Sequence, residues 1–401
     1  MEGIVVDRVC GLDVHKEQVT ACVLLGEGSR LRKCVREFST FTRDLLALVE
    51  WLREEHVTHV AMESTGVYWK PVYAVLESAG ELELVVGNAQ HMKNVPGRKT
   101  DVKDSEWIAR LVRMGLIRKS YVPPLYLRDL RDLVRYRRSV VQARTSERNR
   151  LQKVLETANV KLASVASDVF GKSGKSGMAM LRAMADGESD PRNLAKLAEG
   201  LLRKKIPELE AALDGRLRDH HRYMLRLQLD RLDAADRDVD TLEREIERRL
   251  EPYREQVKLL STIPGVKVQT SASLLAEIGP DMSVFGGPRH LASWAGVCPG
   301  NDESAGKRRS GRSRKGNVHL RSTLVEAAGA AIRTKKTYLR DKYFRLKARR
   351  GHKRATFAIA HKILNAAYEN PHETRAVRGP RGHLPRPGRR KARRQEPRSP
   401  P

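Results

Sequence analysis

Four carboxylate residues within the first 104 positions have the residue types and spacing of a metal site for phosphoryl transfer. They occur in three separate motifs and are Asp13, Glu63, Asp101 and Asp104. The first two each end an apolar, strand-like run, and the last two are three residues apart, so they would share one face of a helix. Acids at two strand ends and on a helix can converge on one point and bind a hard cation such as Mg²⁺. Paired cations of this kind stabilise the attacking and leaving oxygens of phosphoryl transfer.

The segments around these acids predict an α/β domain over residues 1–125. Strand patterns, apolar or alternating, occupy residues 4–12, 18–25, 32–39, 57–62 and 82–86. Helical patterns occupy residues 42–56, 69–78 and 103–116. The resulting order, β-β-β-α-β-α-β-α, is that of an RNase H-like domain, in which acids lie at strand ends and on a late helix.

The net charge of the 401-residue chain, +28, is concentrated towards its C-terminal end. Residues 1–125 contain 17 basic and 17 acidic residues, residues 126–299 contain 31 and 25, and residues 300–401 contain 29 and 7. A neutral front with clustered acids joined to a very basic back is typical of an enzyme that acts on nucleic acid. Solubility alone would not need this segregation.

Cysteine usage and hydropathy predict a cytoplasmic protein that does not associate with a membrane. The four cysteines, Cys10, Cys22, Cys34 and Cys298, lack the paired spacing of a zinc site, which predicts buried, reduced thiols. The chain opens without a signal-peptide pattern, and no apolar stretch reaches the length of a membrane span, ~18 residues.

The middle of the chain, residues 126–256, reads as basic helices followed by a coiled coil for oligomerisation. Residues 126–160 have helical spacing and many arginines, and residues 194–251 have the pattern of a long helical pair or coiled coil. Such a segment favours self-association, with a plain spacer as the alternative. The glycine-rich run at residues 171–177 does not fit the phosphate-binding loop pattern and predicts a flexible turn.

Residues 257–370 predict a helical domain that contains a helix-hairpin-helix. Gly265 lies in an Ile-Pro-Gly-Val turn between two helical patterns, where its backbone could approach a phosphate. An ordinary turn between two helices is the alternative. A polar, cationic loop at residues 301–317 precedes helical patterns at residues 318–334, 336–350 and 353–369. Residues 371–401, rich in Pro, Arg and Gly, predict a disordered basic tail.

These motifs together resemble the insertion sequence one-ten family of DEDD transposases, which is related to the Piv-type DNA invertases. The N-terminal blocks are Gly-Leu-Asp-Val-His-Lys at 11–16, Met-Glu-Ser-Thr-Gly at 62–66 and Lys-Thr-Asp-Val-Lys-Asp-Ser at 99–105. The C-terminal blocks are Ile-Pro-Gly-Val at 263–266, Leu-Leu-Ala-Glu-Ile-Gly at 274–279, Ala-Gly-Val-Cys-Pro at 295–299, Ser-Ala-Gly-Lys at 304–307 and Lys-Gly-Asn at 315–317. Each block alone is weak evidence for the family. The resemblance depends on all of them occurring in the same order as in the family.

The resemblance implies a RuvC-like domain that holds Mg²⁺ through Asp13, Glu63, Asp101 and Asp104, and Mn²⁺ would suit the same oxygens. It also implies assembly into a homodimer or homotetramer through the coiled coil. The implied partners are donor DNA, target DNA and a structured guide (bridge) RNA that pairs with both. The implied location is the bacterial cytoplasm, in association with the nucleoid.

The resemblance further implies a serine nucleophile that becomes covalently linked to DNA. Ser304 is the best candidate, although its motif reads Glu-Ser-Ala-Gly-Lys where many relatives have Ser-Ser-Gly-Gly. Ser310 is the weaker alternative, and Ser304 as a plain loop serine is a third interpretation. A serine hydroxyl needs activation, and neighbouring cations would stabilise the phosphate charge. The cations predicted to contact nucleic acid are Lys307, Arg308, Arg309, Arg312, Arg314 and Lys315.

Three functions fit the sequence. The first is an RNA-guided DNA recombinase that moves its own element and needs both the four acids and Ser304. The second is a metal-dependent, RuvC-like junction nuclease, which uses water and needs only the acids. The third is a non-enzymatic architectural or RNA-binding protein, which would use only the basic half of the chain.

Overall fold

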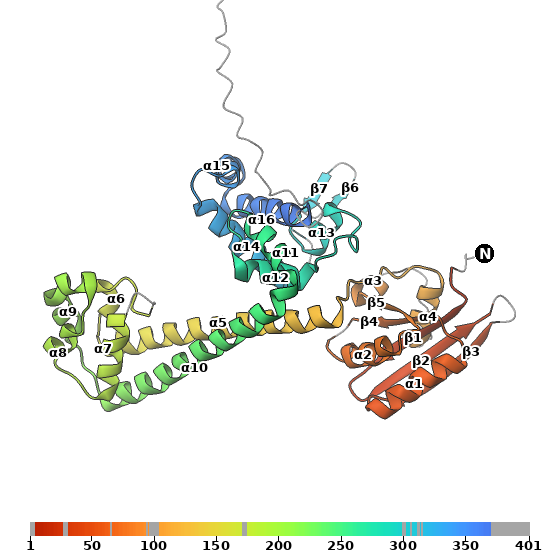
Figure 1. Ribbon diagram of the computed structural model, residues 1–401, viewed down its shortest axis with the longest axis horizontal. Coiled ribbons are helices and arrows are strands. Elements are labelled where there is room, and N and C mark those ends of the chain that lie inside the picture. Colours follow the sequence, from red (N-terminus) through yellow and green to blue (C-terminus); the bar gives the residue numbers. More distant parts are fainter. Residues whose placement is uncertain are drawn as a thin grey trace, which may run out of the picture. The chain divides into compact units, whose positions relative to one another are not determined.

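The computed structural model of the protein describes residues 5–26, 31–64, 66–93, 95, 104–170, 175–298, 302–304, 307–310, 313 and 316–369. These residues divide into two compact units, Met1–Val122 and Pro123–Pro401 (Figure 1). Several predictions fall outside the described residues: Asp101, Arg312, Arg314, Lys315, residues 171–174 of the glycine-rich turn and the tail at 371–401. Within the described ranges, no helix is long and apolar enough to cross a membrane.

A five-stranded mixed sheet forms the centre of the first unit (Figure 1). Its strands are β1 (Arg8–Val14), β2 (Gln18–Leu25), β3 (Arg32–Ser39), β4 (His59–Glu63) and β5 (Glu83–Gly87). The spatial order is β3-β2-β1-β4-β5. The first three strands pair antiparallel, whereas β1, β4 and β5 pair in parallel. The five strands predicted from the sequence are confirmed.

Helices cover both faces of this sheet. The elements are α1 (Thr42–Glu54), α2 (Trp69–Ala79), α3 (Ala89–Lys93) and α4 (Asp104–Arg113). Because side chains alternate along a strand, β1 contributes Leu12 to a core with α1 and α2, and Val9 to a second core with α4. Burial in these cores raises the pKa of the Cys22 thiol to about 11. Cys10 is buried like Cys22, but Cys34 is half-buried, so the prediction of buried cysteines holds only in part.

A pair of long antiparallel helices, α5 (Leu125–Thr157) and α10 (Asp219–Leu250), opens the second unit (Figure 1). Ion pairs join them along their length: Arg144–Asp236, Arg137–Glu243 and Arg249–Asp129. Short elements pack against one end of the pair around a shared apolar core. They are α6 (Leu162–Val165), α7 (Lys175–Asp186), α8 (Pro191–Lys196), η2 (Gly200–Lys205) and α9 (Ile206–Leu213).

This arrangement corrects the interpretation of residues 194–251 as one helical pair or coiled coil. The partner of α10 is α5, which lies about 90 residues earlier in the chain, and residues 194–218 form short helices instead. The apolar residues that carried the prediction, such as Leu225, Leu229 and Ile246, are buried within the chain. Helical spacing shows that a helix has an apolar face, but it does not identify the helix that covers it. A homodimer or homotetramer therefore stays a prediction.

Helices and one small hairpin form the rest of the second unit (Figure 1). The helices are η3 (Glu251–Tyr253), α11 (Arg254–Ser261), α12 (Val268–Ile278), α13 (Pro288–Trp294), α14 (Val318–Arg333), α15 (Tyr338–Arg350) and α16 (His352–Glu369). Strands β6 (Asp302–Ser304) and β7 (Lys307–Ser310) pair antiparallel. The prediction of a loop is therefore wrong for residues 302–304 and 307–310, which form strands. Pairing between such polar and charged residues produces no apolar alternation that could be recognised in the sequence.

Candidate active site

Asp13 and Glu63 lie at the carboxyl ends of two neighbouring parallel strands. Strands β1 and β4 pair in parallel with Leu12 opposite Met62, so the following residue on each strand is one of the two acids. Leu12 and Met62 both face the core under α1 and α2. Because side chains alternate along a strand, Asp13 and Glu63 face the opposite side of the sheet, where α4 packs.

Helix α4 brings Asp104 to the same end of the sheet. The backbone N–H of Val5, just before β1, donates a hydrogen bond to the carbonyl oxygen of Arg113, the last residue of α4 (3.0 Å). The helix therefore runs opposite to β1, and its first residue, Asp104, lies towards the end of β1 that carries Asp13. The structure thus confirms that the elements bearing three of the predicted acids converge.

Gly11 allows this close approach of helix and strand. A Cβ atom on Gly11 would overlap the carbonyl oxygen of Ser105 and the backbone nitrogen of Ala109. Glycine is the residue that permits such backbone contact. Gly11 opens the first N-terminal motif, Gly-Leu-Asp-Val-His-Lys, which by itself indicates no role for the glycine. A glycine inside a strand is a known mark of close backbone approach, so this signal was available.

Two charged neighbours distinguish the acids of this region from one another. Glu106, on the first turn of α4, accepts hydrogen bonds from Lys33 (3.0 Å) and Arg110 (2.7 Å). Burial raises the pKa of Glu106, but the hydrogen bonds and charges of these cations outweigh it and leave the pKa below its ordinary value. Asp13 has one such contact: its Oδ2 lies 3.2 Å from Nε2 of the exposed His15, and 29% of the Asp13 side chain is exposed. Glu106 is therefore occupied by cations, whereas Asp13 is accessible.

The predicted metal fits the donor types of this region. Carboxylate oxygens are the ligands that hard divalent cations take, and three such residues lie on converging elements. Among the residues that the structure describes, no three His, Cys, Asp or Glu side chains form a group that could hold a metal ion. Asp101, the fourth predicted ligand, is outside those residues. Ligation by this set therefore stays a prediction.

The predicted serine lies in the β6–β7 hairpin of the second unit. Ser304 is the last residue of β6 and pairs with Lys307, the first residue of β7. Arg308 and Arg309 continue β7, and Ser310 ends it. The hairpin thus places the backbone of Ser304 opposite Lys307, the first of three consecutive cationic residues, and places Glu303 opposite Arg308.

Gly265 has a role in packing in addition to the phosphate contact that its motif predicts. It lies in the turn between α11 and α12 with φ of +88°, a conformation that favours glycine. A Cβ atom there would lie 2.6 Å from the backbone nitrogen of Ala331 and would overlap the carbonyl oxygen of Ala327, both on α14. The glycine therefore lets the turn pack against α14, and its contact with a phosphate stays a prediction.

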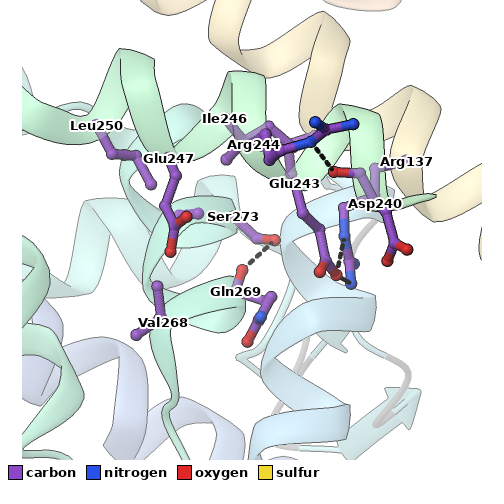
Figure 2. Close-up of a pocket in the computed structure, with 12 residues that line it drawn as sticks. Arg137, Asp240, Glu243, Arg244, Ile246, Glu247, Leu250, Val268, Gln269 and Ser273 are labelled. Atoms are coloured by element: carbon purple, nitrogen blue, oxygen red, sulfur yellow. Dashed lines mark hydrogen bonds and ion pairs between the residues drawn. The ribbon is translucent and has the colours of Figure 1, made fainter. Parts of the chain in front are cut away.

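A cavity of about 460 Å³ lies among α5, α10 and α12 (Figure 2). Its apolar wall includes Val134, Ile246 and Leu250, and Arg137 donates a hydrogen bond to Glu243 at its edge (Nε–Oε1 3.0 Å). Of the predicted catalytic and nucleic-acid-binding residues that the structure describes, none is among the residues that line this cavity.

Comparisons with known proteins identify both regions. Residues 10–160 match a family model for the DEDD transposases of IS110 elements, described as "Transposase". Residues 257–344 match the model "Transposase IS116/IS110/IS902 family". The transposase for insertion sequence element IS1111A of Coxiella burnetii is 27% identical over 278 residues, which are 68% of this chain and 67% of that protein.

The two matched ranges contain the residues predicted to act in catalysis. The first includes the mixed sheet with Asp13, Glu63 and Asp104, which is the RuvC-like DEDD domain, and the second includes Ser304. A DEDD domain indicates dependence on a divalent metal, and a transposase has DNA as its substrate. The protein is therefore a DNA-processing enzyme that acts by phosphoryl transfer. Because the two models together cover more than half of the sequence, the chain belongs to the IS110 family of transposases.

Proposed function

We propose that the protein moves its own insertion sequence by cutting and rejoining DNA with Mg²⁺ and a serine nucleophile, under the guidance of a bridge RNA. The observation that supports the proposal is that β1, β4 and α4, the elements that bear Asp13, Glu63 and Asp104, meet at one end of the sheet. The order of the sequence motifs and the excess of cations after residue 300 support the remaining parts.

In this proposal the four acids, Asp13, Glu63, Asp101 and Asp104, hold the divalent cation. Mg²⁺ is the expected ion, and Mn²⁺ would satisfy the same carboxylates. The bound cation supplies positive charge at the scissile phosphate. Asp13 is exposed enough to contact a ligand, and Gly11 keeps α4 against β1 so that Asp104 stays near the strand ends.

The serine step conserves the energy of the phosphodiester bond. A bond forms between Ser304 Oγ and phosphorus, and the bond from phosphorus to one deoxyribose oxygen breaks. The serine hydroxyl loses a proton, and the departing deoxyribose oxygen gains one. The reverse step, with a hydroxyl from the exchanged strand as nucleophile, rejoins the DNA and releases the serine. Lys307, Arg308 and Arg309 would stabilise the charge of the transition state. Arg312, Arg314 and Lys315 would bind the adjoining backbone.

The proposal also includes assembly. Donor and target DNA would pair with the guide RNA, and a homodimer or homotetramer would let the acids of one protomer act on the phosphate attacked by the serine of another. Mixing Asp13→Ala protein with Ser304→Ala protein tests this arrangement. Recovery of recombination in the mixture, when each variant alone is inactive, would support it.

A second candidate is a RuvC-like junction nuclease that activates water. The observation that favours it is that Asp13, Glu63 and Asp104 all belong to one compact unit, which does not contain Ser304. This candidate requires no serine and leaves free DNA ends instead of rejoined junctions.

A two-plasmid recombination assay separates these candidates. The gene's flanking non-coding DNA is supplied, and junctions are sequenced for the wild type, Ser304→Ala and Ser310→Ala, with and without EDTA. Junctions from the wild type and Ser310→Ala only, lost with EDTA, would support the proposal. Junctions from Ser304→Ala would exclude this serine as the nucleophile, and cleavage without junctions would favour the nuclease.

A further inference from the structure

A buried carboxylate in the second unit has no role in the chemistry proposed so far. Glu277, in the last turn of α12, is only 2% exposed. Arg135 of α5 donates two hydrogen bonds to it, from Nε to Oε1 (2.8 Å) and from Nη2 to Oε2 (2.9 Å). Burial raises the pKa of Glu277, but these hydrogen bonds and the charges of Arg131 and Arg135 outweigh it, so the pKa lies below its ordinary value. Glu277 is therefore an ionised group in the interior.

Asn317 connects this carboxylate to the end of the serine-bearing segment. Its Nδ2 donates to Oε2 of Glu277 (2.6 Å), and its Oδ1 accepts from the backbone N–H of Leu320, which caps α14 (3.0 Å). Its own backbone N–H donates to the carbonyl oxygen of Trp294 in α13 (3.1 Å). One residue therefore holds together α12, α13 and α14.

Both ends of the segment that carries Ser304 meet at this point. A Cβ atom on Gly316 would lie 2.5 Å from the backbone nitrogen of Gly296 and 2.6 Å from the carbonyl oxygen of Trp294. The other end is fixed next to it, because the backbone N–H of Val297 donates to the carbonyl oxygen of Ala292 (3.1 Å). The segment 297–316 therefore starts and ends at the same turn, and Asn317 lies at its base.

We propose that Glu277 is a positioning residue for the serine reaction. It acts through Asn317 to fix the base of the segment that carries Ser304, and through Arg135 it ties that base to the long helix α5. The inference rests on the proposed role of Ser304. A displacement of about 1 Å in a reacting group can cost about 10²-fold in rate, so the fixation of this base matters for the chemical step.

Stability alone explains this arrangement less well. A buried ion pair is often no more stabilising than apolar residues of the same volume, because removing both charges from water is costly. Arg131 donates to the carbonyl oxygens of Ala276 (3.0 Å) and Glu277 (2.8 Å), so it retains partners without the carboxylate. At the base of the segment that carries Ser304, the carboxylate provides one contact that no other group replaces, the hydrogen bond with Asn317.

The test uses the full-length protein with its flanking DNA and adjoining non-coding RNA. The rate of covalent Ser304–DNA adduct formation is measured at saturating DNA for Glu277→Gln, Asn317→Ser and the double variant. Serine caps a helix as well as asparagine does, so Asn317→Ser removes the link to Glu277 and keeps the cap of α14. The matched control is Glu243→Gln, which removes another carboxylate paired with an arginine of α5. Glu243 lies at the edge of the cavity (Figure 2).

We expect each single variant to slow adduct formation about tenfold or more, whereas DNA affinity stays within about twofold of that of Glu243→Gln. The double variant is expected to be no slower than the slower single variant, because both substitutions break one link. If Glu277→Gln is no slower than the control, or if the two effects multiply, the inference is overturned. A wild type that forms no Ser304 adduct would instead overturn the proposed function, and with it this inference.

Discussion

The two regions that carry the candidate catalytic residues are held in place by different interactions. The acids follow from strand register and apolar packing, with Leu12 and Met62 buried beneath them and α4 packed against Gly11. The end of the segment that carries Ser304 is instead held by polar contacts, in which Asn317 and a buried carboxylate take part. Many shared contacts stabilise the first region, whereas the second depends on each of a few partners. Single substitutions should therefore have different consequences in the two regions.

The largest effect is expected at Asp13 itself. Asp13→Ala should reduce recombination at least about 10³-fold, the scale of losing a group that stabilises transition-state charge. The melting temperature should change little, because this side chain is partly exposed and outside both cores. His15→Ala is the matched control: it removes only the exposed contact to Asp13, so we expect less than about a tenfold loss. Full recombination by Asp13→Ala would remove the acids from the mechanism.

Gly11→Ala tests the packing that positions the acids. The new Cβ must displace α4, so we expect a loss of about 3 kcal/mol in the free energy of unfolding of the first unit, together with most of the recombination activity. Gly80→Ala is the control. The added Cβ meets no atom within 4 Å, and the only strain comes from the φ of +74°. This variant should therefore lose about 1 kcal/mol in the free energy of unfolding and keep its activity. Urea denaturation, monitored by hydrogen exchange of amides in the first unit, measures the free energy of unfolding of both variants. Equal costs for the two variants would contradict the role of Gly11.

The same difference explains how much the sequence could predict. The sheet was predictable because period-2 apolar runs end at the acids, and a parallel register then places Asp13 beside Glu63. The partner of α10 was not predictable, because helical spacing identifies the buried face of a helix but not the helix that packs on that face. The role of Glu277 was also hidden, since it depends on Arg135, which lies 142 residues earlier in the chain. In a local pattern the motif itself contains the information, whereas a polar cluster becomes visible only in the folded chain.

Gly316→Ala makes the corresponding change at the base of the hairpin. The Cβ would press on the backbone at Gly296 and Trp294, and we expect the rate of adduct formation to fall about 10²-fold. The substitution leaves the acids untouched, so Mg²⁺-dependent nicking of DNA without adduct formation should survive. Gly351→Ala, at a glycine with no atom within 4 Å of the added Cβ, is the control for a glycine substitution in the same unit. Parallel loss of nicking and adduct formation would mean that the two regions are not separable.

The smallest effect concerns pH. Because the folded-state pKa of Glu277 is lowered, its contribution to stability is present above the unfolded-state value, about 4.3, and is lost as pH falls through the lower folded-state value. The stability gap between the wild type and Glu277→Gln should therefore narrow as pH falls below about 4.3. Hydrogen exchange of amides in α12 and α14 measures it locally.

Glu245→Gln supplies the contrast for this pH test. Hydrogen bonds from Arg248 and Arg249 lower the pKa of the Glu245 carboxyl to about 2, but this group is on the surface. Salt screens exposed pairs more than buried ones, so added NaCl should remove the pH-dependent gap for Glu245→Gln and leave most of the gap for Glu277→Gln. A gap for Glu277→Gln that is constant with pH, or that salt removes as readily, would show that the buried carboxylate is not held by Arg131 and Arg135. The polar description of the hairpin base would then be wrong, and its stability would have to come from apolar packing, as it does beneath the acids.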